Sequence, residues 1–144
     1  MQRVKLLLVD DETAFLDAMT RRLLKRDFEI LSATSGMDAL QILNDNSDMV
    51  EVVILDVKMP GMDGIETLAE IKRKFPLIEV VMLTGHATVD SAIDGMKQGA
   101  FDYLMKPCEM DALVAKVHEA AAKKRSHEEK IIEARMREIT TRHA

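Results

Sequence analysis

Residues 51–64 read EVVILDVKMPGMDG: a short apolar run is followed by a carboxylate and then by a loop. The apolar, mostly β-branched run at 52–55 suits a strand that is buried on both faces of a parallel sheet. Asp56 follows this run directly, and Pro60 and two glycines then break regular structure. A carboxylate at the carboxyl end of a buried strand lies where open α/β sheets place their sites. A single aspartate there would most simply cap a turn, so the assignment depends on the ends of the other strands.

Four further segments have the length and composition of strands, and helical patterns with apolar residues three or four positions apart lie between and after them. The other expected strands are Val4–Val9, Phe28–Ala33, Glu79–Leu83 and Phe101–Met105. Strands that alternate with helices at short spacing indicate an α/β fold with a doubly wound, five-stranded parallel sheet. Right-handed crossovers leave few topologies, and the flavodoxin-like strand order 2-1-3-4-5 fits this chain.

The helix expected after the fourth strand is predicted to turn four apolar residues toward the sheet: Val89, Ala92, Ile93 and Met96. Gly95 lies inside this helix, where a glycine costs about 1 kcal/mol relative to alanine. We therefore expect this helix to be the least rigid of the five.

Length and composition predict one globular domain and argue against several classes of function. The 144 residues are 47% hydrophobic and 31% charged, so the chain can build a full core. The net charge is −5 and the only basic cluster is Lys123–Arg125, which argues against direct binding of nucleic acid. Cys108 is the single cysteine, so an internal disulfide is impossible, and no apolar run is long enough to span a membrane. A cytoplasmic location is the expectation.

In the predicted strand order the first and third strands are neighbours, and both end in carboxylates. Asp10 and Asp11 follow the first strand and Asp56 follows the third, so three carboxylates converge at one edge of the sheet. Like charges a few Å apart repel one another unless a cation is bound, and Mg²⁺ suits oxygen ligands of this kind. The sequence therefore predicts a magnesium site. With a different strand order, the three carboxylates would be separate surface groups.

Two further polar residues are expected at the same edge, since Thr84 ends the fourth strand and Lys106 follows the fifth. A hydroxyl and an ammonium beside carboxylates and Mg²⁺ make a site that can stabilise the anionic oxygens of a phosphoryl group. No serine, cysteine or histidine occupies the centre of this cluster, so the nucleophile must be a carboxylate. The implied covalent state is an aspartyl phosphate on Asp56.

Four segments together resemble the receiver domain of bacterial two-component response regulators. They are LLLVDDE at 6–12, VVILDVKMPGMDG at 52–64, LTGHA at 83–87 and GAFDYLMKP at 99–107. The resemblance implies a receiver domain over residues 1–122. Helix formers continue beyond it, so we expect a helical C-terminal extension over residues 123–144. The segment 83–113 looks most like the receivers of σ54-dependent, NtrC-type regulators.

The resemblance implies a role for each carboxylate of the cluster. It makes Asp56 the acceptor of a phosphoryl group, which a sensor histidine kinase would donate. It assigns Mg²⁺ to Asp10, Asp11, Asp56 and the backbone carbonyl of Lys58. Within this set we expect Asp11 and Asp56 to bind the ion directly and Asp10 to act mainly through water.

The resemblance also assigns the residues that respond to the phosphate. Thr84 matches the hydroxyl that moves to the phosphate, Lys106 the lysine that pairs with it, and Tyr103 the aromatic residue that turns inward with Thr84. Phosphorylation would then reshape the face made by the fourth helix, the fifth strand and the final helix. A cis peptide is implied at Lys106–Pro107. Lys58 and His86 occupy rim positions that influence phosphate lifetime in the family.

Two other functions fit parts of this pattern. A phosphatase with an aspartate nucleophile usually carries a second aspartate two residues later, where this chain has Lys58, and it needs a cap insertion that this sequence lacks. A pseudo-receiver that only binds partners is disfavoured because all five site residues are present. We therefore expect a switch whose only intrinsic chemistry is phosphotransfer and autodephosphorylation. It would be either a stand-alone regulator or an excised receiver module of a larger transcriptional regulator.

The final helix is expected to bury Leu113, Val117 and Ala120 against the sheet and to continue well past residue 125. The segment Lys123–Lys130 has no apolar residue, so the sequence predicts that it projects into solvent. Apolar residues return only beyond residue 130.

Ile132, Met136 and Ile139 share one face of this expected helix at i, i+4 and i+7. The pattern covers about one and a half heptads, which is too little for a convincing coiled coil. An isolated helix of this length is marginal in water unless its apolar face finds a partner. We therefore expect this face to meet another chain, most simply in a homodimer, and a frayed tail is the alternative.

Overall fold

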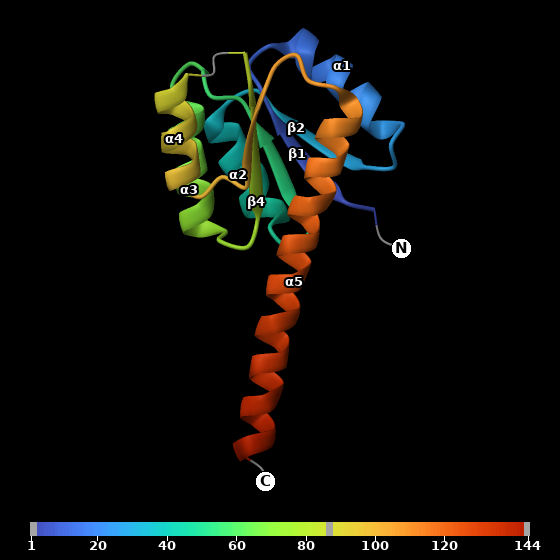
Figure 1. Cartoon of the computed structure of the whole chain (residues 1–144), viewed down its shortest axis with the longest axis vertical. Helices are drawn as coiled ribbons and strands as arrows, with labels where there is room; N and C mark the ends of the chain where they lie inside the picture. The colour runs from blue at the N-terminus through green and yellow to red at the C-terminus, as the bar shows by residue number, and fades with distance from the viewer. Residues whose placement is uncertain (1–2, 86–87, 143–144) are drawn as a thin grey trace.

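The computed structural model describes residues 3–85 and 88–142, and these ranges form a central sheet flanked by helices (Figure 1). The strands are β1 (Lys5–Val9), β2 (Glu29–Ala33), β3 (Val52–Leu55), β4 (Glu79–Thr84) and β5 (Asp102–Met105). All neighbours pair in parallel in the order β2-β1-β3-β4-β5, so the predicted topology is confirmed. The predicted bounds differ by one residue at four ends: Val4, Phe28 and Phe101 precede their strands, and β4 includes Thr84.

Helices cover both faces of the sheet. They are α1 (Thr13–Leu24), α2 (Gly36–Asn46), α3 (Gly64–Lys74), α4 (Val89–Lys97) and α5 (Met110–Arg142). Successive side chains of a strand point to opposite faces, so β1 feeds two separate cores. Leu6 and Leu8 pack with α1 and α5, whereas Leu7 and Val9 pack with α2 and α3. Every residue of β3 is buried, which explains its continuous apolar run.

Local sequence signals set the starts of three helices. The Ser35 hydroxyl accepts a hydrogen bond from the Asp38 N–H at 3.1 Å, and the Asp63 carboxylate accepts one from the Glu66 N–H at 2.9 Å. Such side-chain caps satisfy backbone donors that have no partner inside the helix. The start of α4 is a capping box in which the N-cap residue Thr88 and the side chain of Ser91 satisfy each other's backbone donors.

The prediction that α4 turns Val89, Ile93 and Met96 inward is wrong. These side chains are 76%, 46% and 48% exposed, and Gly95 is the one buried residue of this helix. The reason lies in Gly95: a Cβ at this position would lie 3.3 Å from the Tyr103 ring, so the helix approaches β5 along its glycine side. The apolar residues of α4 are therefore left on the surface.

Helix α5 is continuous from Met110 to Arg142, which confirms that it extends well past residue 125 (Figure 1). The prediction that Lys123–Lys130 projects into solvent is wrong for its first residues. Lys124 is buried, and the side chains of Lys123 and Arg125 form ion pairs with glutamates of the sheet. Beyond residue 130, Ile132, Met136 and Ile139 are more than half exposed. No helix among the described residues is long and apolar enough to cross a membrane.

Candidate functional site

The carboxyl ends of the strands bring the predicted site residues to one edge of the sheet. Asp10 follows β1, Asp56 follows β3, Thr84 ends β4, and Lys106 follows β5. One carboxylate oxygen each from Asp10, Asp11 and Asp56 lies within 4.8 Å of the others, as the strand order predicted. Asp10 and Asp56 are almost fully buried, whereas Asp11 is exposed. The cluster is therefore half enclosed and open to solvent on the Asp11 side.

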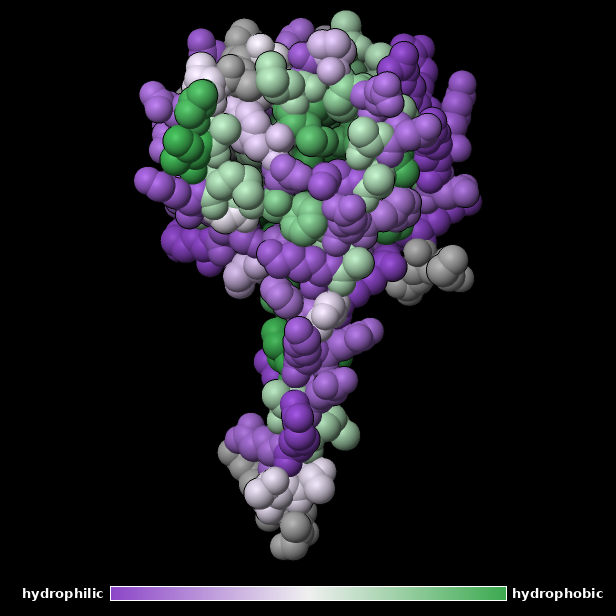
Figure 2. Space-filling model, in the orientation of Figure 1, coloured by the Kyte–Doolittle hydropathy of each residue, from purple (hydrophilic) through white to green (hydrophobic). Residues whose placement is uncertain are grey.

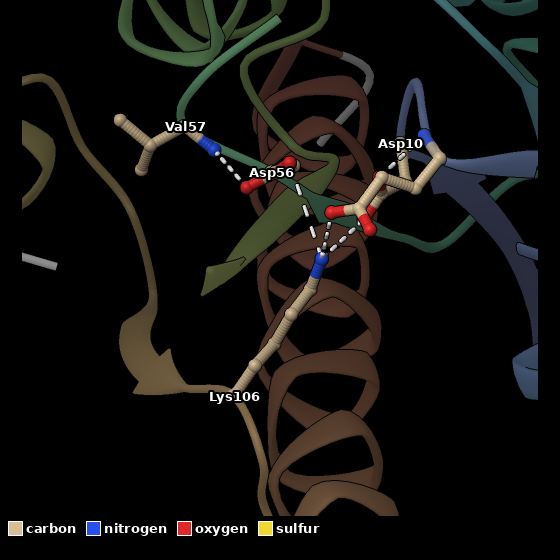
Figure 3. A network of polar contacts seen from close by, with 5 residues as sticks. Asp10, Asp56, Val57 and Lys106 are labelled. Carbon is tan, nitrogen blue, oxygen red and sulfur yellow. Dashed lines mark hydrogen bonds and ion pairs between the residues drawn. The ribbon is translucent and has the colours of Figure 1, made fainter. Parts of the chain in front are cut away.

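Lys106 extends its ammonium between these carboxylates (Figure 3). Its Nζ lies 2.6 Å from Asp10 Oδ2 and 4.0 Å from Asp56 Oδ2, with Glu12 Oε1 at 3.7 Å. The same ammonium lies 3.8 Å from the centre of the Phe15 ring, in the geometry of a cation–π contact. Lys106 thus lies between two buried carboxylates, Asp10 after β1 and Asp56 after β3, and against the Phe15 ring of α1.

The environment of Asp56 disfavours its charged form. Burial is the largest effect and raises its pKa above the ordinary value. A hydrogen bond from the Thr84 side chain lowers the pKa, the negative charge of Asp10 raises it, and Lys106 and the Val57 N–H lower it again. The Val57 N–H donates to Asp56 Oδ1 at 2.8 Å, so Oδ2 faces Lys106 (Figure 3). The net direction of the pKa is upward, because the cost of burying the charged carboxylate, together with the charge of Asp10, outweighs the stabilising contacts.

This donor set fits a magnesium ion. Mg²⁺ binds oxygen ligands and keeps several waters, so it needs a few carboxylates beside open space. Asp11 and Asp56 line an open pocket together with Lys58, Met59, Pro60 and neighbouring carboxylates. A cation beside Asp56 would also relieve the like-charge repulsion that raises its pKa. Asp10, Asp11 and Asp56 are therefore placed to hold the ion.

Tyr103 lies on β5 and points toward α4. Its hydroxyl is 2.8 Å from the Ser91 Oγ, and its ring packs beside Gly95. Thr84 is fully buried, and its side chain forms a hydrogen bond with Asp56. Because β4 pairs with β5, Thr84 and Tyr103, the two residues predicted to respond to the phosphate, lie on adjacent strands. Tyr103 contacts the helix rather than standing free on the surface.

The structure also describes all but one of the other positions that the sequence analysis singled out near the site. Lys58 is exposed at the rim of the open pocket, as expected. The Lys106–Pro107 peptide is cis, which confirms that expectation. Cys108 packs against the α1–α5 core, and burial raises the pKa of its thiol, so it suits a packing role. His86, predicted to be a rim residue, lies outside the described residues.

Three contributors to this site have no assignment from the sequence. Glu12 lies beside the acidic pair and approaches Lys106, although no role follows from its position in the chain. Phe15 has the spacing of a core residue on the apolar face of α1, a pattern that cannot reveal a contact with a lysine 91 positions away. The Val57 N–H is a backbone group without any side-chain signal. Of the three, only Glu12 could have been suspected from the sequence, because it belongs to the acidic run DDE that follows the first strand.

Residues 6–118 match the family model described as the response regulator receiver domain. The chain belongs to this family. A crystal structure of a response regulator receiver domain protein from Clostridium thermocellum has a TM-score of 0.81 and 38% identity to this chain. The aligned region covers 85% of this chain and 97% of the Clostridium thermocellum chain. Receiver domains are the phosphorylatable modules of two-component response regulators, and the geometry at Asp56 agrees with this membership.

Curated relatives confirm the predicted likeness to NtrC-type receivers. The transcriptional regulatory protein ZraR of Klebsiella oxytoca is 35% identical over 132 residues, which are 92% of this chain and 29% of that protein. The DNA-binding transcriptional regulator NtrC of Escherichia coli K12 is 35% identical over 120 residues, or 83% of this chain and 25% of that protein. The chain thus spans about a quarter of the length of these regulators.

Proposed function

We propose that Asp56 accepts a phosphoryl group from a sensor histidine kinase in a reaction that depends on Mg²⁺. The observation that carries this proposal is the placement of Asp56 Oδ2, which faces Lys106 at 4.0 Å in a cluster with Asp10 and Asp11. A buried carboxylate with a nearby ammonium and an open side is suited to attack phosphorus. The open side would admit the donor.

In this step Asp56 Oδ2 forms a bond to the phosphorus of a phosphohistidine, and the phosphorus–nitrogen bond breaks. The electron pair stays on the histidine nitrogen, which takes up a proton. The Val57 N–H holds Oδ1 at 2.8 Å, which fixes the orientation of the attacking carboxylate. Lys106 stabilises the charge on the phosphoryl oxygens, and the Thr84 hydroxyl is within reach of the product.

Asp10, Asp11 and Asp56, with the Lys58 backbone carbonyl, would hold Mg²⁺ beside the acceptor. When bound, the ion neutralises the carboxylates and the phosphoryl oxygens. The contribution of the chain is to hold these ligands rigidly: the Glu12 N–H donates to Asp10 Oδ1 at 2.9 Å, and Lys106 fixes Oδ2 of the same side chain. With both oxygens engaged, Asp10 is suited to act through water, whereas the exposed Asp11 is free to bind directly.

Labelling with acetyl phosphate and Mg²⁺ tests the acceptor and the metal together. We expect Asp56→Asn to abolish labelling, and Asp11→Ala to weaken Mg²⁺ binding and slow labelling strongly. The matched control is Asp17→Asn, an exposed carboxylate on the outer side of α1. Wild-type labelling of Asp56→Asn would refute the acceptor assignment, and wild-type Mg²⁺ affinity of Asp11→Ala would refute the metal site.

Phosphorylation is proposed to act on the face formed by α4, β5 and α5. In this structure Val89, Ile93 and Met96 on α4 and Met105 on β5 leave large apolar side chains exposed. Figure 2 shows this hydrophobic surface over α4. Scattered exposed apolar residues are ordinary, but a cluster on one helix marks a surface for a partner. If Thr84 moves toward the phosphate and Tyr103 turns inward after it, α4 would shift, and the position of these apolar side chains on the surface would change.

Amide exchange in Val89–Lys97 tests this route. Beryllofluoride, a mimic of the phosphoryl group, should change exchange in this helix in the wild type and much less in Thr84→Ala. The matched control is Thr67→Ala on α3, a buried threonine whose hydroxyl bonds to the Asp63 carbonyl and not to the site. Equal responses of wild type and Thr84→Ala would exclude Thr84 as the link.

We further propose that the apolar stripe formed by Ile132, Met136 and Ile139 pairs with a second copy of this chain. The three side chains are 59%, 58% and 51% exposed on the distal part of α5, where every residue from 129 to 141 is exposed. Residues 126–142 carry as many basic as acidic side chains, so two copies do not repel one another through net charge. The acidic ones are Glu128, Glu129, Glu133 and Glu138, and the basic ones are Lys130, Arg135, Arg137 and Arg142.

Sedimentation of the full chain tests the homodimer. Replacement of the stripe by Ile132→Gln, Met136→Gln and Ile139→Gln should convert a dimer into a monomer, because it removes the apolar area that is buried on pairing. Met37→Gln, an equally exposed methionine on α2, is the control and should leave the dimer intact. If the wild type is monomeric both with and without beryllofluoride, the stripe is not a dimer contact.

The output of the switch is proposed to be that of a transcriptional regulator. The support is that both curated relatives described above are transcriptional regulators and that the chain matches only a quarter of their length. Receiver residues 1–122 and the extension 123–144 would then link the phosphorylation site to whatever segment or protein carries the output. Co-purification of a σ54-dependent effector with the phosphorylated form, compared with Asp56→Asn, would test this assignment.

A further inference from the structure

Two glutamates lie at the amino edge of the sheet, opposite the phosphorylation site. Glu51 directly precedes β3, and Glu79 is the first residue of β4. The Glu79 N–H donates to the Glu51 carbonyl at 3.2 Å, so the two residues are neighbours in the sheet. Their side chains are only 14% and 3% exposed. Asp56 directly follows β3 and Thr84 ends β4, so each of these strands has a site residue at its carboxyl end and a glutamate at its amino end.

Helix α5 supplies a cation to each glutamate. The Arg125 guanidinium binds Glu51 with both arms of its fork, with Nε at 2.6 Å from Oε2 and the second nitrogen at 2.8 Å from Oε1. This carboxylate raises the pKa of Arg125. Lys123 Nζ lies 3.2 Å from Glu79 Oε2, while Lys72 of α3 takes Oε1 at 3.1 Å. All four carboxylate oxygens therefore have a cationic partner.

These pairs differ from ordinary surface ion pairs in that their carboxylates are largely shielded from solvent, although Lys123 and Arg125 are each 46% exposed. An exposed pair contributes about 0–1 kcal/mol, because water and salt screen it. Glu79 is buried, and a buried carboxylate that loses its partners is costly, since its charge is left without compensation. Bidentate arginine–carboxylate contacts also restrict direction as well as distance. The path of α5 over the sheet edge is thus restricted at Lys123 and Arg125.

Apolar packing of α5 ends before this point. Among the described residues, Leu113, Val117, Ala120 and Ala121 are the buried apolar side chains of this helix, and none follows Ala121. The part that we call the arm, residues 126–142, projects away from the domain (Figure 1). Lys124 is buried beside the sheet edge and pairs with Glu128 one turn later, which continues the polar anchoring by one turn.

We propose that the pairs Glu51–Arg125 and Glu79–Lys123 form a clamp that fixes the direction of the arm. The clamp makes residues 123–125 part of the rigid receiver body, and it presents the apolar stripe to a second copy of this chain in one orientation. Two paired arms then hold two phosphorylation sites in a defined arrangement. The second half of this inference rests on the proposed homodimer, whereas the fixed direction does not.

Distance measurement by double electron–electron resonance tests the fixed direction. Spin labels at Met37→Cys on α2 and Ala134→Cys on the arm, in a Cys108→Ser background, report the angle between body and arm. Dilution into excess unlabelled protein suppresses distances between copies. The unmodified clamp should give one narrow distance distribution, and Arg125→Gln should broaden it, because the fork and its charge are lost.

Matched variants separate the clamp from a general effect on α5. Arg26→Gln removes another ion pair to this helix, Arg26–Asp111 at 2.6 Å, but at its exposed first turn, and should leave the distribution narrow. The exchange Glu51→Arg with Arg125→Glu restores an ion pair and should narrow the distribution again. Circular dichroism and beryllofluoride binding at Asp56 confirm that each variant is folded. If Arg125→Gln does not fold, Lys123→Gln makes the same test at Glu79.

If the distance between the two spin labels is distributed as narrowly in Arg125→Gln as in the wild type, the clamp proposal is refuted. Sedimentation of the unlabelled proteins tests its consequence for pairing. We expect Arg125→Gln to raise the dissociation constant of the dimer about tenfold, because a mobile arm loses more conformational entropy when two copies associate. A monomeric wild type with a narrow distribution would refute the homodimer and leave the clamp intact. An unchanged dimer affinity together with a broadened distribution would show that arm direction does not govern pairing.

Discussion

The Tyr103 hydroxyl and the Ser91 Oγ lie 2.8 Å apart, and this contact links β5 to the first turn of α4. Ser91 also accepts a hydrogen bond from the Thr88 N–H at 3.0 Å and so completes the capping box of the helix. One serine therefore serves both the helix start and the tyrosine. Any movement of Tyr103 toward Thr84 has to break this contact, which ties the position of the ring to the stability of α4.

Ser91→Ala should loosen the first turn of α4 and free Tyr103. Loss of a capping hydrogen bond costs about 1 kcal/mol, so amides in Val89–Lys97 should exchange several-fold faster. Tyr103 is the only tyrosine and the chain has no tryptophan, so its fluorescence reports the ring directly. We expect Ser91→Ala to shift this fluorescence partway toward the beryllofluoride-bound value. Ser91→Thr keeps a hydroxyl and is the control; fluorescence of Ser91→Ala identical to wild type would show that the contact does not hold the ring.

Asp56→Asn should stabilise the protein at neutral pH in the absence of metal. The pKa of Asp56 is raised in the fold, mainly by burial, so the folded state binds its proton more tightly than the unfolded chain does. The unfolding free energy contributed by this group is highest below the unfolded pKa of about 3.9 and falls as pH rises through the folded value. At pH 7 the ionised carboxylate is therefore unfavourable, and asparagine removes it with a gain of about 1 kcal/mol.

Thermal unfolding as a function of pH tests this sign. The difference in midpoint between Asp56→Asn and wild type should be largest at neutral pH and vanish toward about pH 4, near the unfolded pKa. Saturating Mg²⁺ should reverse the order, since an ion present at about 100 times its dissociation constant stabilises the wild type by about 2.7 kcal/mol. Asp17→Asn, an exposed carboxylate, should show neither effect. A destabilised Asp56→Asn at pH 7 without metal would contradict the direction of the pKa shift.

The sheet and the site could be predicted because their determinants are local and repeated. The buried runs of β1 and β3 are each followed by an aspartate, and that of β4 ends in Thr84. Parallel strands bring their carboxyl ends together, so the sequence alone is enough to place Asp10, Asp56 and Thr84 at one edge. The orientation of α4 could not be predicted, because an apolar face looks the same whether it covers a sheet or a partner. Ion pairs between residues far apart, such as Glu51 and Arg125, leave no periodic signal at all.

Phe15→Leu should slow phosphorylation of Asp56 by freeing the Lys106 ammonium. The ring centre lies 3.8 Å from Lys106 Nζ, and such a contact contributes about 0.5–1 kcal/mol or more when it is partly shielded from water. The lost positioning should reduce the rate of labelling by acetyl phosphate about threefold. Phe15→Tyr keeps an aromatic face and should restore the rate.

Proton NMR of Lys106 separates positioning from a general loss of packing. In the wild type the ring current of Phe15 should shift the terminal methylene protons of Lys106 upfield, and Phe15→Leu should abolish this shift. Phe101→Leu is the matched control, because Phe101 faces Lys123 at 5.6 Å and lies away from the carboxylate cluster. Wild-type shifts of the Lys106 resonances in Phe15→Leu would show that the ring does not hold the ammonium.

Gly64→Ala should disrupt the acceptor by steric contact alone. Gly64 is the first residue of α3, not a loop residue, and its N–H donates to the Val57 carbonyl at 2.7 Å. A Cβ at this position would lie 1.9 Å from the Asp56 carbonyl oxygen and 2.7 Å from the Val57 Cα. Both are backbone atoms, which cannot move aside as a flexible side chain can. The methyl group must therefore push α3 away from the end of β3.

We expect Gly64→Ala to lose about 3 kcal/mol of unfolding free energy and to label poorly with acetyl phosphate, because the Val57 N–H that orients Asp56 moves. Chemical denaturation and labelling measure the two effects separately. Gly36→Ala is an informative comparison, since a Cβ there would approach the Thr67 side chain at 2.2 Å and should affect stability more than labelling. If Gly64→Ala unfolds and labels like the wild type, the β3–α3 connection is compliant, and the tight contact at Asp56 does not position the acceptor.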